Sequence, residues 1–195
     1  MNKIPTIFAR VNNKITNAYV KQVVDFPFAN SIATEKLDGT NVRLTIRNHI
    51  LVRLEKRFNP SKQSKEKGII EPWYIDAQQL DPSDAYIWEA ARNTKLEMVP
   101  DGEWSGEAVG PKIQGNPLNL NDHRVMLFSL EQAVSGLPVF ENVPITFEEL
   151  KVWLPQQKSK YGNDCGIEGV VWHAPDGRMA KIKTKDFRRL KDEMA

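Results

Sequence analysis

Residues 35–41 read Glu-Lys-Leu-Asp-Gly-Thr-Asn and lead into a segment in which apolar and polar residues alternate. The alternation covers residues 42–46 and returns over residues 50–54, and a period of two is typical of strands with one buried face. The polar residues 47–49 separate the two runs. We therefore expect a β-hairpin directly after this stretch, with the three apolar residues of 42–46 on one face.

A second hairpin is expected near the end of the chain. Residues 166–174 and 179–184 flank a Pro-Asp-Gly-Arg sequence, and an Asp-Gly pair between two such runs favours a tight hairpin turn. Lys181 and Lys183 lie two positions apart in the second strand, so their side chains would share one face. Glu168 lies at the head of the first strand.

The remaining segments predict a mixture of strands and helices. We expect a mobile surface loop over residues 58–68, a helix from a Ser83 cap to about Val99, strands over 102–109 and 124–131, a helix from a Thr146 cap to about Leu154, and a short basic helix over 186–194. The helices are interspersed among the strands without a regular βαβ rhythm. The predicted fold class is therefore α+β, with mostly antiparallel sheets and flanking helices.

The bulk composition is that of a soluble globular protein. The 195 residues suffice for one domain with a real core, and 41% of them are hydrophobic. Lys and Arg number 27 against 25 Asp and Glu, which excludes a histone-like basic tail but permits a local basic face. The single cysteine excludes a disulfide framework and fits a reducing compartment. No apolar run approaches about 20 residues and the start lacks a signal-peptide core, so we expect a cytoplasmic protein with no membrane association.

Lys36 is a candidate nucleophile. A free lysine has a pKa of about 10.4, so freeing its lone pair at pH 7 costs roughly 4–5 kcal/mol unless the site lowers that pKa. Nearby cations do so, and Lys181 and Lys183 would supply them if their face meets Lys36, while also neutralising a triphosphate. Gly39 permits close approach of the backbone to a ligand. Glu168 offers the hard oxygen ligands that Mg²⁺ prefers, which predicts a metal-assisted displacement at phosphorus.

Two motifs carry a resemblance to a known family. Lys36, Gly39, Thr40 and Asn41 fit a Lys-x-x-Gly-Thr-Asn nucleophile motif, and residues 106–114 are close to a ribose-binding Gly-Glu-Leu-x-Gly-Pro-x-Ile-Gln segment. By these motifs the chain resembles the covalent nucleotidyltransferases, the superfamily of polynucleotide ligases and mRNA capping enzymes. Within that superfamily it is most similar to ATP-dependent RNA ligases of the bacteriophage RNA ligase 2 type.

The resemblance implies which residues form the site. The catalytic residues would be Lys36, Lys181 and Lys183. The metal ligands would be Glu168 and Asp38. The residues in contact with the nucleotide would be Glu35, Lys36, Asn41, Arg57, Glu107, Phe128, Glu168, Lys181 and Lys183. The implied cofactors are ATP, present as AMP covalently bound to Lys36, and Mg²⁺ or Mn²⁺.

Two of these assignments have rivals. Arg57 would contact the nucleotide or the RNA end, and Arg53 is the alternative because the alignment needs one inserted residue to reach Arg57. Glu107 would accept a hydrogen bond from the ribose, and Glu103 is the alternative because its Asp-Gly-Glu context resembles the DNA-ligase version of the motif.

Two features depart from the family pattern. Phe128 would stack on adenine, but Ser129 replaces the acid that usually follows. Only about ten residues follow the last motif, where ligases and capping enzymes usually carry an OB-fold or a helical module. We therefore expect residues 1–195 to form a single adenylyltransferase domain, a minimal catalytic core of phage or bacterial type without a C-terminal module.

The implied reaction has three steps. Lys36 attacks the α-phosphate of ATP and releases pyrophosphate, AMP passes to an RNA 5′-phosphate, and a 3′-hydroxyl displaces AMP and closes the phosphodiester bond. Asp38 would hold a metal-bound water or orient Lys36, and Asn41 would help to position the RNA termini. RNA would be the partner of a monomeric enzyme, with a separate substrate-binding protein as one source of the missing module.

Three other functions share parts of this pattern. A DNA nick ligase would use the same core, a capping-type nucleotidyltransferase would take GTP, and a catalytically silent RNA-binding relative would form no protein–AMP adduct. Lys62, Lys65 and Lys67 have two interpretations, since they would either touch the RNA backbone or keep their loop soluble.

Overall fold

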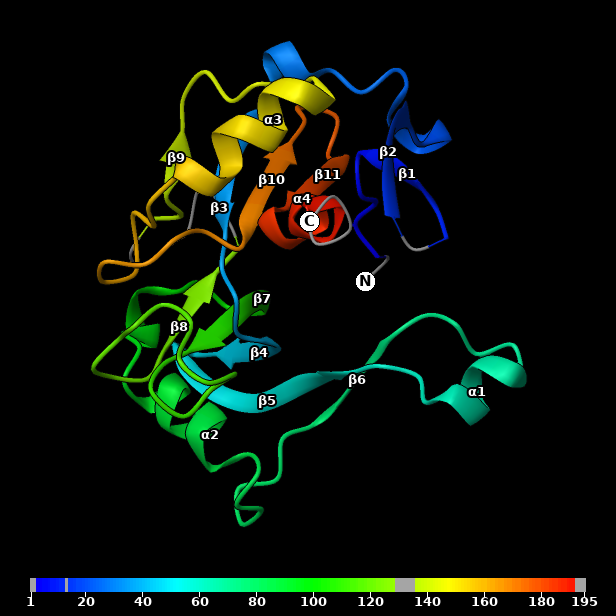
Figure 1. The fold of residues 1–195 in the computed structure, drawn as a ribbon. Helices are drawn as coiled ribbons and strands as arrows, with labels where there is room; N and C mark the ends of the chain where they lie inside the picture. The colour runs from blue at the N-terminus through cyan, green and yellow to red at the C-terminus, as the bar shows by residue number, and fades with distance from the viewer. Residues whose placement is uncertain (1–2, 13, 129–135, 192–195) are drawn as a thin grey trace. The chain divides into compact units, whose positions relative to one another are not determined.

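The computed structural model describes residues 3–12, 14–128 and 136–191 (Figure 1). The chain divides into two compact units. The first consists of Met1–Lys3 and Asp38–Leu137, and the second of Ile4–Leu37 and Pro138–Ala195. The boundary between Leu37 and Asp38 falls inside the stretch with which the sequence analysis began, so each unit is described by itself.

The first unit is built on a five-stranded sheet with the strand order β6-β5-β4-β7-β8. All four strand pairs are antiparallel. The strands are β4 (Thr40–Arg47), β5 (Ile50–Phe58), β6 (Trp73–Asp76), β7 (Gly102–Val109) and β8 (Arg124–Leu127). The sheet therefore begins one residue after Gly39, immediately beyond the predicted nucleophile motif.

The two faces of this sheet differ in polarity. Val42, Leu44 and Ile46 are fully buried on one face and share a core cluster with residues of α2 (Ala85–Arg92), which lies against that face (Figure 1). The alternate positions of β4, including Asn41 and Arg43, project to the opposite, polar face. Burial of the apolar face accounts for the alternation in the sequence.

A hairpin arm, defined here as residues 56–73, extends from the edge of the sheet. Its base is the paired ends of β5 and β6, and it carries α1 (Lys62–Glu66) at its far end (Figure 1). The hydroxyl of Ser61 accepts a hydrogen bond from the backbone N–H of Ser64 at 3.1 Å and so caps α1. The loop predicted over 58–68 was therefore wrong in part, because a capped helix forms inside it.

The second unit contains a four-stranded antiparallel sheet with the order β11-β10-β3-β9, together with a two-stranded sheet, β1-β2. The strands are β1 (Phe8–Val11), β2 (Lys14–Tyr19), β3 (Ile32–Lys36), β9 (Val139–Phe140), β10 (Gly169–His173) and β11 (Met179–Lys183). The helices are α3 (Phe147–Trp153) and α4 (Thr184–Lys191). Lys36 is thus the last residue of a central strand.

One face of the four-stranded sheet forms the core of the second unit. Val170 and Trp172 of β10 and Ile182 of β11 are buried in a cluster with Leu150 of α3 and Phe187 of α4. The residues between them in each strand project to the other face, which includes all three lysines singled out from the sequence. Burial on one side of the sheet thus fixes which side the lysines occupy.

Among the described residues, four short 3₁₀ turns complete the elements of the two units. They span Lys21–Val23, Phe28–Asn30, Leu96–Met98 and Leu154–Gln156. Within the part of the chain that the structure describes, none of the helices has the length and hydrophobicity needed to cross a membrane.

The structure confirms both predicted hairpins. β4 and β5 join through Asn48 and His49, whose φ values of 50° and 60° are left-handed. β10 and β11 join through a turn in which Gly177 has a φ of 82°, a value that favours glycine. The fold class was also predicted correctly as α+β with antiparallel sheets. Of the strand expected over 124–131, the part up to Leu127 is confirmed, and residues 129–131 lie outside the described residues.

The helix predicted from Ser83 to about Val99 was too long. It begins at Ala85, because the Ser83 hydroxyl donates to the Asp84 carboxylate rather than accepting a backbone N–H. It ends at Arg92, where the Thr94 hydroxyl donates to a helical carbonyl at 2.7 Å and accepts the N–H of Val125 in β8 at 2.8 Å. The hydrogen bonds that link Thr94 to the helix and to β8 thus take the place of the last predicted helical turns.

The other two helix predictions were closer. The Thr146 hydroxyl accepts from the Glu149 N–H at 3.4 Å and bonds its carboxylate at 2.6 Å, which confirms the predicted capping pair. The basic helix begins at Thr184, two residues earlier than predicted, and the Thr184 hydroxyl donates to the carbonyl of Ile167 at 2.9 Å.

Candidate functional site

The register of the second unit's sheet brings two predicted lysines onto one line. Gly169 of β10 pairs with Lys36 of β3 on one side and with Lys183 of β11 on the other. Directly paired residues project to the same face, so the two lysines flank a position that has no side chain. A Cβ at Gly169 would lie 2.0 Å from the carbonyl oxygen of Ile182. Glycine is therefore required where the strands approach most closely.

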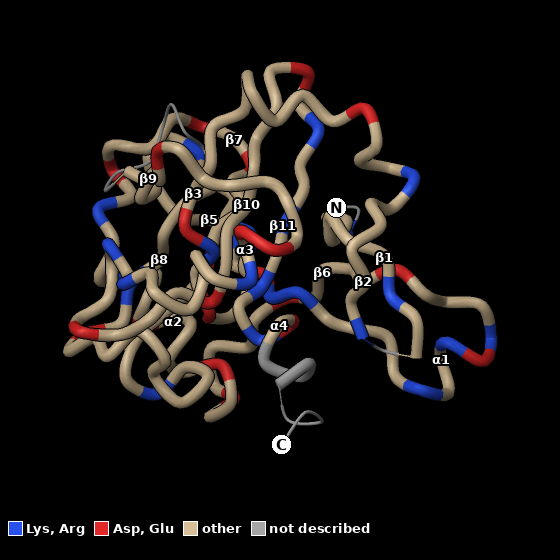
Figure 2. Tube along the Cα trace, turned by 45° about the horizontal axis from the view of Figure 1, so that its top comes forward, with Lys and Arg blue, Asp and Glu red and all other residues tan. Residues whose placement is uncertain are grey.

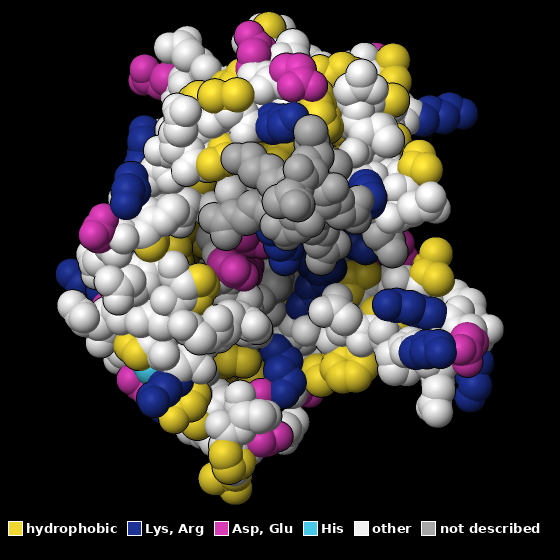
Figure 3. Space-filling view, in the orientation of Figure 1, with side chains coloured by type: hydrophobic (Ala, Val, Ile, Leu, Met, Phe, Trp, Pro, Cys, Tyr) yellow, Lys and Arg dark blue, Asp and Glu magenta, His cyan; other side chains and the backbone are white. Residues whose placement is uncertain are grey.

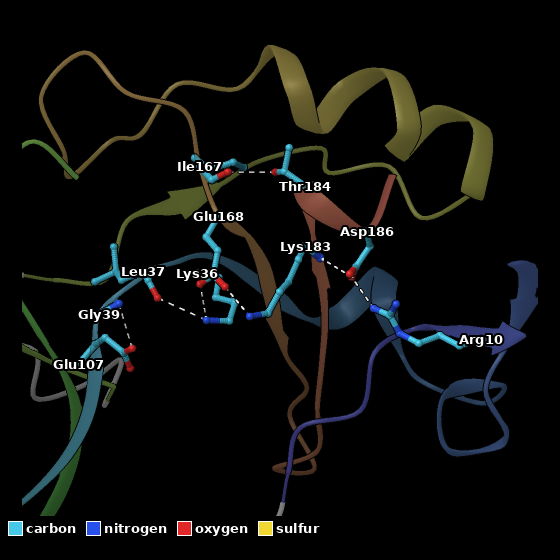
Figure 4. A network of polar contacts seen from close by, with 10 residues as sticks. All are labelled: Arg10, Lys36, Leu37, Gly39, Glu107, Ile167, Glu168, Lys183, Thr184 and Asp186. Carbon is cyan, nitrogen blue, oxygen red and sulfur yellow. Dashed lines mark hydrogen bonds and ion pairs between the residues drawn. The ribbon is translucent and has the colours of Figure 1, made fainter. Parts of the chain in front are cut away.

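Glu168 joins the two lysines into a charged trio (Figure 4). The Lys36 Nζ lies 2.5 Å from the Glu168 Oε2, and the Lys183 Nζ donates to the Oε1 of the same carboxylate. The Glu168 side chain is only 8% exposed, and those of Lys36 and Lys183 are 19% and 24% exposed. Burial by itself would raise the pKa of Glu168, but Lys36 and Lys183 outweigh burial and hold that pKa below its ordinary value.

The trio corrects one expectation about Lys36. The sequence analysis predicted that the cations of β11 act directly on this lysine and disfavour its ammonium form. The structure instead places an anion, Glu168, between Lys36 and Lys183. The two lysines therefore contact a shared, buried counter-ion, which lies between them.

A second carboxylate fixes the end of β11. Asp186, which is buried, accepts the backbone N–H of Lys183 at 3.3 Å and the guanidinium of Arg10 at 2.6 Å (Figure 4). Lys181 projects from the same face as Lys183, two positions earlier in β11 and opposite Val171. The two phosphate-binding lysines predicted from the sequence therefore share one face, as the Lys-Ile-Lys spacing requires.

Glu35 faces the other way. Its carboxylate lies on the core side of β3, is 2% exposed, and accepts hydrogen bonds from the Ser159 hydroxyl at 2.5 Å and the Lys160 N–H at 2.8 Å. Burial raises the pKa of Glu35, against the lowering effect of these hydrogen bonds. The side chain of Glu35 is therefore not on the lysine face, where the sequence analysis had placed a nucleotide contact.

The first unit holds the other predicted site residues. Glu107, which is 8% exposed, accepts the backbone N–H of Gly39 at 3.2 Å (Figure 4). A Cβ at Gly39 would lie 2.2 Å from the carbonyl oxygen of Ala108, so this turn packs tightly on β7. By contrast the rival Glu103 has a 53% exposed side chain, 3.6 Å from Arg43. The buried, hydrogen-bonded carboxylate of Glu107 is therefore better placed than that of Glu103 to hold a ligand in one orientation.

Asn41 is held by a residue that the sequence analysis did not identify. The Tyr74 hydroxyl donates to the Asn41 Oδ1 at 2.7 Å, and the Asn41 Nδ2 donates to the Gly106 carbonyl at 3.2 Å. Asn41 pairs directly with Glu107 across β4 and β7, so both side chains project to the polar face. No sequence signal links Tyr74 to Asn41, because they lie 33 positions apart.

The two candidate arginines have opposite surroundings. The Arg57 Nε is buried, and no hydrogen-bond partner for it occurs among the described residues. Arg53 is half-exposed and pairs with Asp76 at 2.6 Å and with Glu55 at 3.3 Å. A buried donor without a partner is costly, so Arg57 is the arginine with capacity for a ligand.

Phe128 and Asp38 both belong to the first unit. Phe128 is half-buried directly after β8, and its N–H donates to the Ser105 carbonyl at 2.9 Å. Ser129, the departure noted in the sequence, lies outside the described residues. Asp38 is half-buried, and among the described residues no group of three or more His, Cys, Asp and Glu side chains gathers around a metal position. Any metal would therefore rely on oxygen atoms from its ligand as well as from protein.

Comparison with known proteins establishes the fold. The structure is similar to "Naegleria gruberi RNA ligase with PPi", with a TM-score of 0.58 and 16% identity over 98% of this chain and 62% of the ligase chain. Structures of mutants of that ligase match similarly: one with AMP and Mn at TM-score 0.57 and 17% identity, and one with ATP and Mn at 0.58 and 16%. They cover 97% and 100% of this chain and 62% of each ligase chain. No family model and no curated protein matches the sequence.

The chain thus has the nucleotidyltransferase fold of RNA ligases and spans 62% of the length of the ligase chains it matches. This confirms the fold that the motif resemblance implied. The RNA ligase 2 subtype, the reaction and the roles of the site residues do not follow from a shared fold at this identity.

Proposed function

We propose that this protein is an ATP-dependent RNA ligase of the RNA ligase 2 type that works through a lysyl-AMP intermediate on Lys36. The observation that carries the proposal is the trio of Lys36, Glu168 and Lys183, aligned through Gly169 on one face of a sheet. Support also comes from the fold, since the structures it resembles include an RNA ligase with ATP and Mn and with AMP and Mn.

The first step forms a bond between the Lys36 Nζ and the α-phosphorus of ATP and breaks the bond to pyrophosphate, which leaves. The ammonium form of Lys36 must first release a proton, because only the neutral amine has the lone pair that attacks phosphorus. The residues suit a metal, because Glu168 offers carboxylate oxygens and Asp38 is the second predicted ligand. Mg²⁺ or Mn²⁺ held there would supply positive charge beside the phosphates and relieve Lys36 of its counter-ion.

The other site residues bind and orient the nucleotide. Lys181 and Lys183 neutralise its phosphates from β11, Glu107 accepts a hydrogen bond from the ribose, and Phe128 stacks on the adenine. Arg57 offers its unpartnered donor to a phosphate of the nucleotide or of the RNA end.

Two further steps complete the ligation. AMP passes from Lys36 to an RNA 5′-phosphate, and the RNA 3′-hydroxyl then attacks that phosphate and displaces AMP. Asn41, held in place by Tyr74, helps to position the two RNA ends. RNA is the proposed partner of a monomeric enzyme, and a separate substrate-binding protein would help to hold the RNA.

Intact-mass measurement after incubation with ATP and Mg²⁺ tests the first step. We expect one added AMP on the wild type and on a Lys95→Ala control, which changes an exposed lysine, and none on Lys36→Ala. An adduct that persists on Lys36→Ala would show that the nucleophile is misassigned. Incubation with GTP in parallel identifies a capping-type enzyme, and matched RNA and DNA nicks identify a DNA ligase.

A further inference from the structure

We propose that the arm, residues 56–73, binds a strand of the polynucleotide substrate, with its lysines on backbone phosphates and its aromatic pair stacked on a base. The inference deepens the proposed function and depends on it only for the identity of the polynucleotide as RNA. The arm belongs wholly to the first unit and carries α1 beyond the edge of the sheet (Figure 1).

Positive charge is concentrated at the end of the arm. Residues 61–68 contain three lysines and one glutamate, so these eight residues carry a net charge of +2, which equals the formal charge of the whole 195-residue chain. Lys62, Lys65 and Lys67 are all exposed. Blue positions cluster around α1 in Figure 2, and dark blue side chains gather at the end of the arm in Figure 3. Flexible, exposed lysines are suited to a phosphate backbone.

An exposed aromatic pair lies at the base of the arm. Phe58 and Trp73 pair directly across β5 and β6, and their ring centroids are 5.0 Å apart. Their residues are 41% and 39% exposed, and Ile69 and Ile70 nearby are 49% and 67% exposed. Exposed apolar side chains grouped beside cations indicate a partner that offers both flat apolar surface and negative charge.

A polynucleotide satisfies both conditions better than a protein does. Each nucleotide combines one phosphate with one stackable base, so a strand of several nucleotides can contact both the lysines at the end of the arm and the aromatic pair at its base. The arm is also continuous with the residue proposed for the RNA end, since Arg57 immediately precedes Phe58 in β5. Adjacent residues of a strand project to opposite faces, so a strand bound at Arg57 reaches the aromatic pair by passing around the edge of the sheet that β6 forms.

Removal of the arm's charge tests the phosphate contacts. The variant Lys62→Ser/Lys65→Ser/Lys67→Ser is compared with a control of equal charge change at exposed lysines elsewhere, Lys21→Ser/Lys95→Ser/Lys158→Ser. Fluorescence anisotropy measures binding of a labelled, 5′-phosphorylated single-stranded RNA without ATP, over a range of salt concentrations. We expect the arm variant to bind at least about tenfold more weakly and to lower the slope of log K against log salt by about 2, at roughly 0.7 per phosphate contact. In the control variant, the RNA affinity and the salt slope should both stay close to their wild-type values.

Removal of one ring tests the stacking. Trp73→Ala should weaken RNA binding about tenfold and leave the slope of log K against log salt unchanged. Trp73→Phe should retain most of the wild-type affinity, because a phenyl ring also stacks. Circular dichroism of each variant checks that the fold is retained. Wild-type affinity and slope in the lysine variant, or equal weakening in the matched control, would overturn the proposal and leave the apolar patch to a protein partner.

A parallel measurement separates this proposal from the proposed function. Formation of the protein–AMP adduct needs ATP but no RNA, so the arm variants should form it at the wild-type rate. If the wild type forms no adduct while the arm variants lose RNA binding, the ligase proposal fails and the arm proposal stands. If the adduct forms and the arm variants bind RNA normally, the reverse conclusion holds.

Discussion

The predicted site residues on the polar faces of the two sheets are held in place in different ways. In the second unit, Lys36 and Lys183 share the carboxylate of Glu168 at short range, so these site residues are held by ion pairs. In the first unit, Glu107 holds the Gly39 turn and Tyr74 holds Asn41, so these two site residues act through directed hydrogen bonds, beside the Arg43–Glu55 ion pair of the same face. Ion pairs can exchange partners when a charged ligand arrives, whereas a hydrogen-bonded scaffold keeps its shape and offers fixed donors and acceptors.

This difference predicts which substitutions affect which property. A buried carboxylate between two lysines is stable only while both signs of charge are present, so a change there affects both stability and chemistry. A substitution in the first unit that keeps an oxygen acceptor retains the hydrogen bond from the backbone N–H, so it should affect ligand affinity with less effect on stability.

Substitution of Glu168 should have the largest effect. Glu168→Ala leaves the two lysines as unpaired neighbours of like charge, and we expect a loss of about 2 kcal/mol in the free energy of unfolding. We also expect adduct formation with ATP to slow at least about 100-fold, because the proposed metal loses its carboxylate. Urea unfolding and time-resolved intact mass measure the two effects.

Glu168→Gln keeps the shape of the side chain and removes its charge, so it separates packing from electrostatics. We expect it to retain more stability than Glu168→Ala but to be as slow in adduct formation. Adduct formation at the wild-type rate in Glu168→Gln would contradict a role for this charge and remove the distinction between the two faces.

Substitution of Glu107 should have an intermediate effect, confined to nucleotide recognition. Glu107→Gln retains an oxygen for the Gly39 N–H but accepts a ribose hydroxyl less strongly, so the concentration of ATP needed for half-maximal adduct formation should rise about tenfold. The preference for ATP over its 2′-deoxy and 3′-deoxy analogues should shrink in the variant. Titration of adduct yield with each nucleotide measures both.

Glu103→Gln is the matched control, because Glu103 lies on the same strand and face but is half-exposed and close to Arg43. It should leave the nucleotide preference unchanged. If Glu103→Gln and not Glu107→Gln alters that preference, the rival assignment from the sequence is the correct one.

The elements that the sequence predicted well are local. Both hairpins depend on alternation and on a turn between adjacent strands, and these signals lie within about 20 residues of each other. The charged trio is not local, because Lys36 and Glu168 are 132 positions apart and meet only through the pairing of β3 with β10. Motif order indicated that these residues belong together, but only the register shows Gly169 between the lysines.

For Glu35, the sequence itself indicated that its side chain lies on the face opposite Lys36, although the motif placed both residues at the nucleotide. Adjacent residues of a strand project to opposite faces, so Glu35 and Lys36 cannot both present side chains to one ligand from β3. Tyr74 and Ser159 had no comparable signal, since each acts on a residue distant in the chain. The helix of the arm was missed because a charged five-residue segment capped by Ser61 resembles a loop in composition.

The smallest expected effect is on the pH dependence of stability. It compares Glu35 and Glu168, whose side chains lie on opposite faces of the second unit's sheet. Burial raises the pKa of Glu35 and the lysines lower that of Glu168, so the two groups should give opposite pH dependence. The pKa of Glu168 is lowered from its ordinary value of 4.5. As the pH falls from 4.5 through this lowered pKa, the stabilisation that ionised Glu168 gives to the folded state is lost. Between 4.5 and the raised pKa of Glu35, the folded state binds more protons than the unfolded state, so stability from Glu35 falls as the pH rises.

Glu35→Gln cannot ionise and should therefore flatten the decline of stability as the pH rises from 4.5, while the loss of stability at lower pH, which Glu168 governs, persists. Urea unfolding at constant ionic strength over this range measures both slopes, with Glu97→Gln, at an exposed position, as the control. Parallel profiles for the wild type and Glu35→Gln above pH 4.5 would mean that Glu35 is not held in a desolvated environment. In that case its side chain would again be a candidate for the nucleotide contact that the strand geometry assigns to the other face.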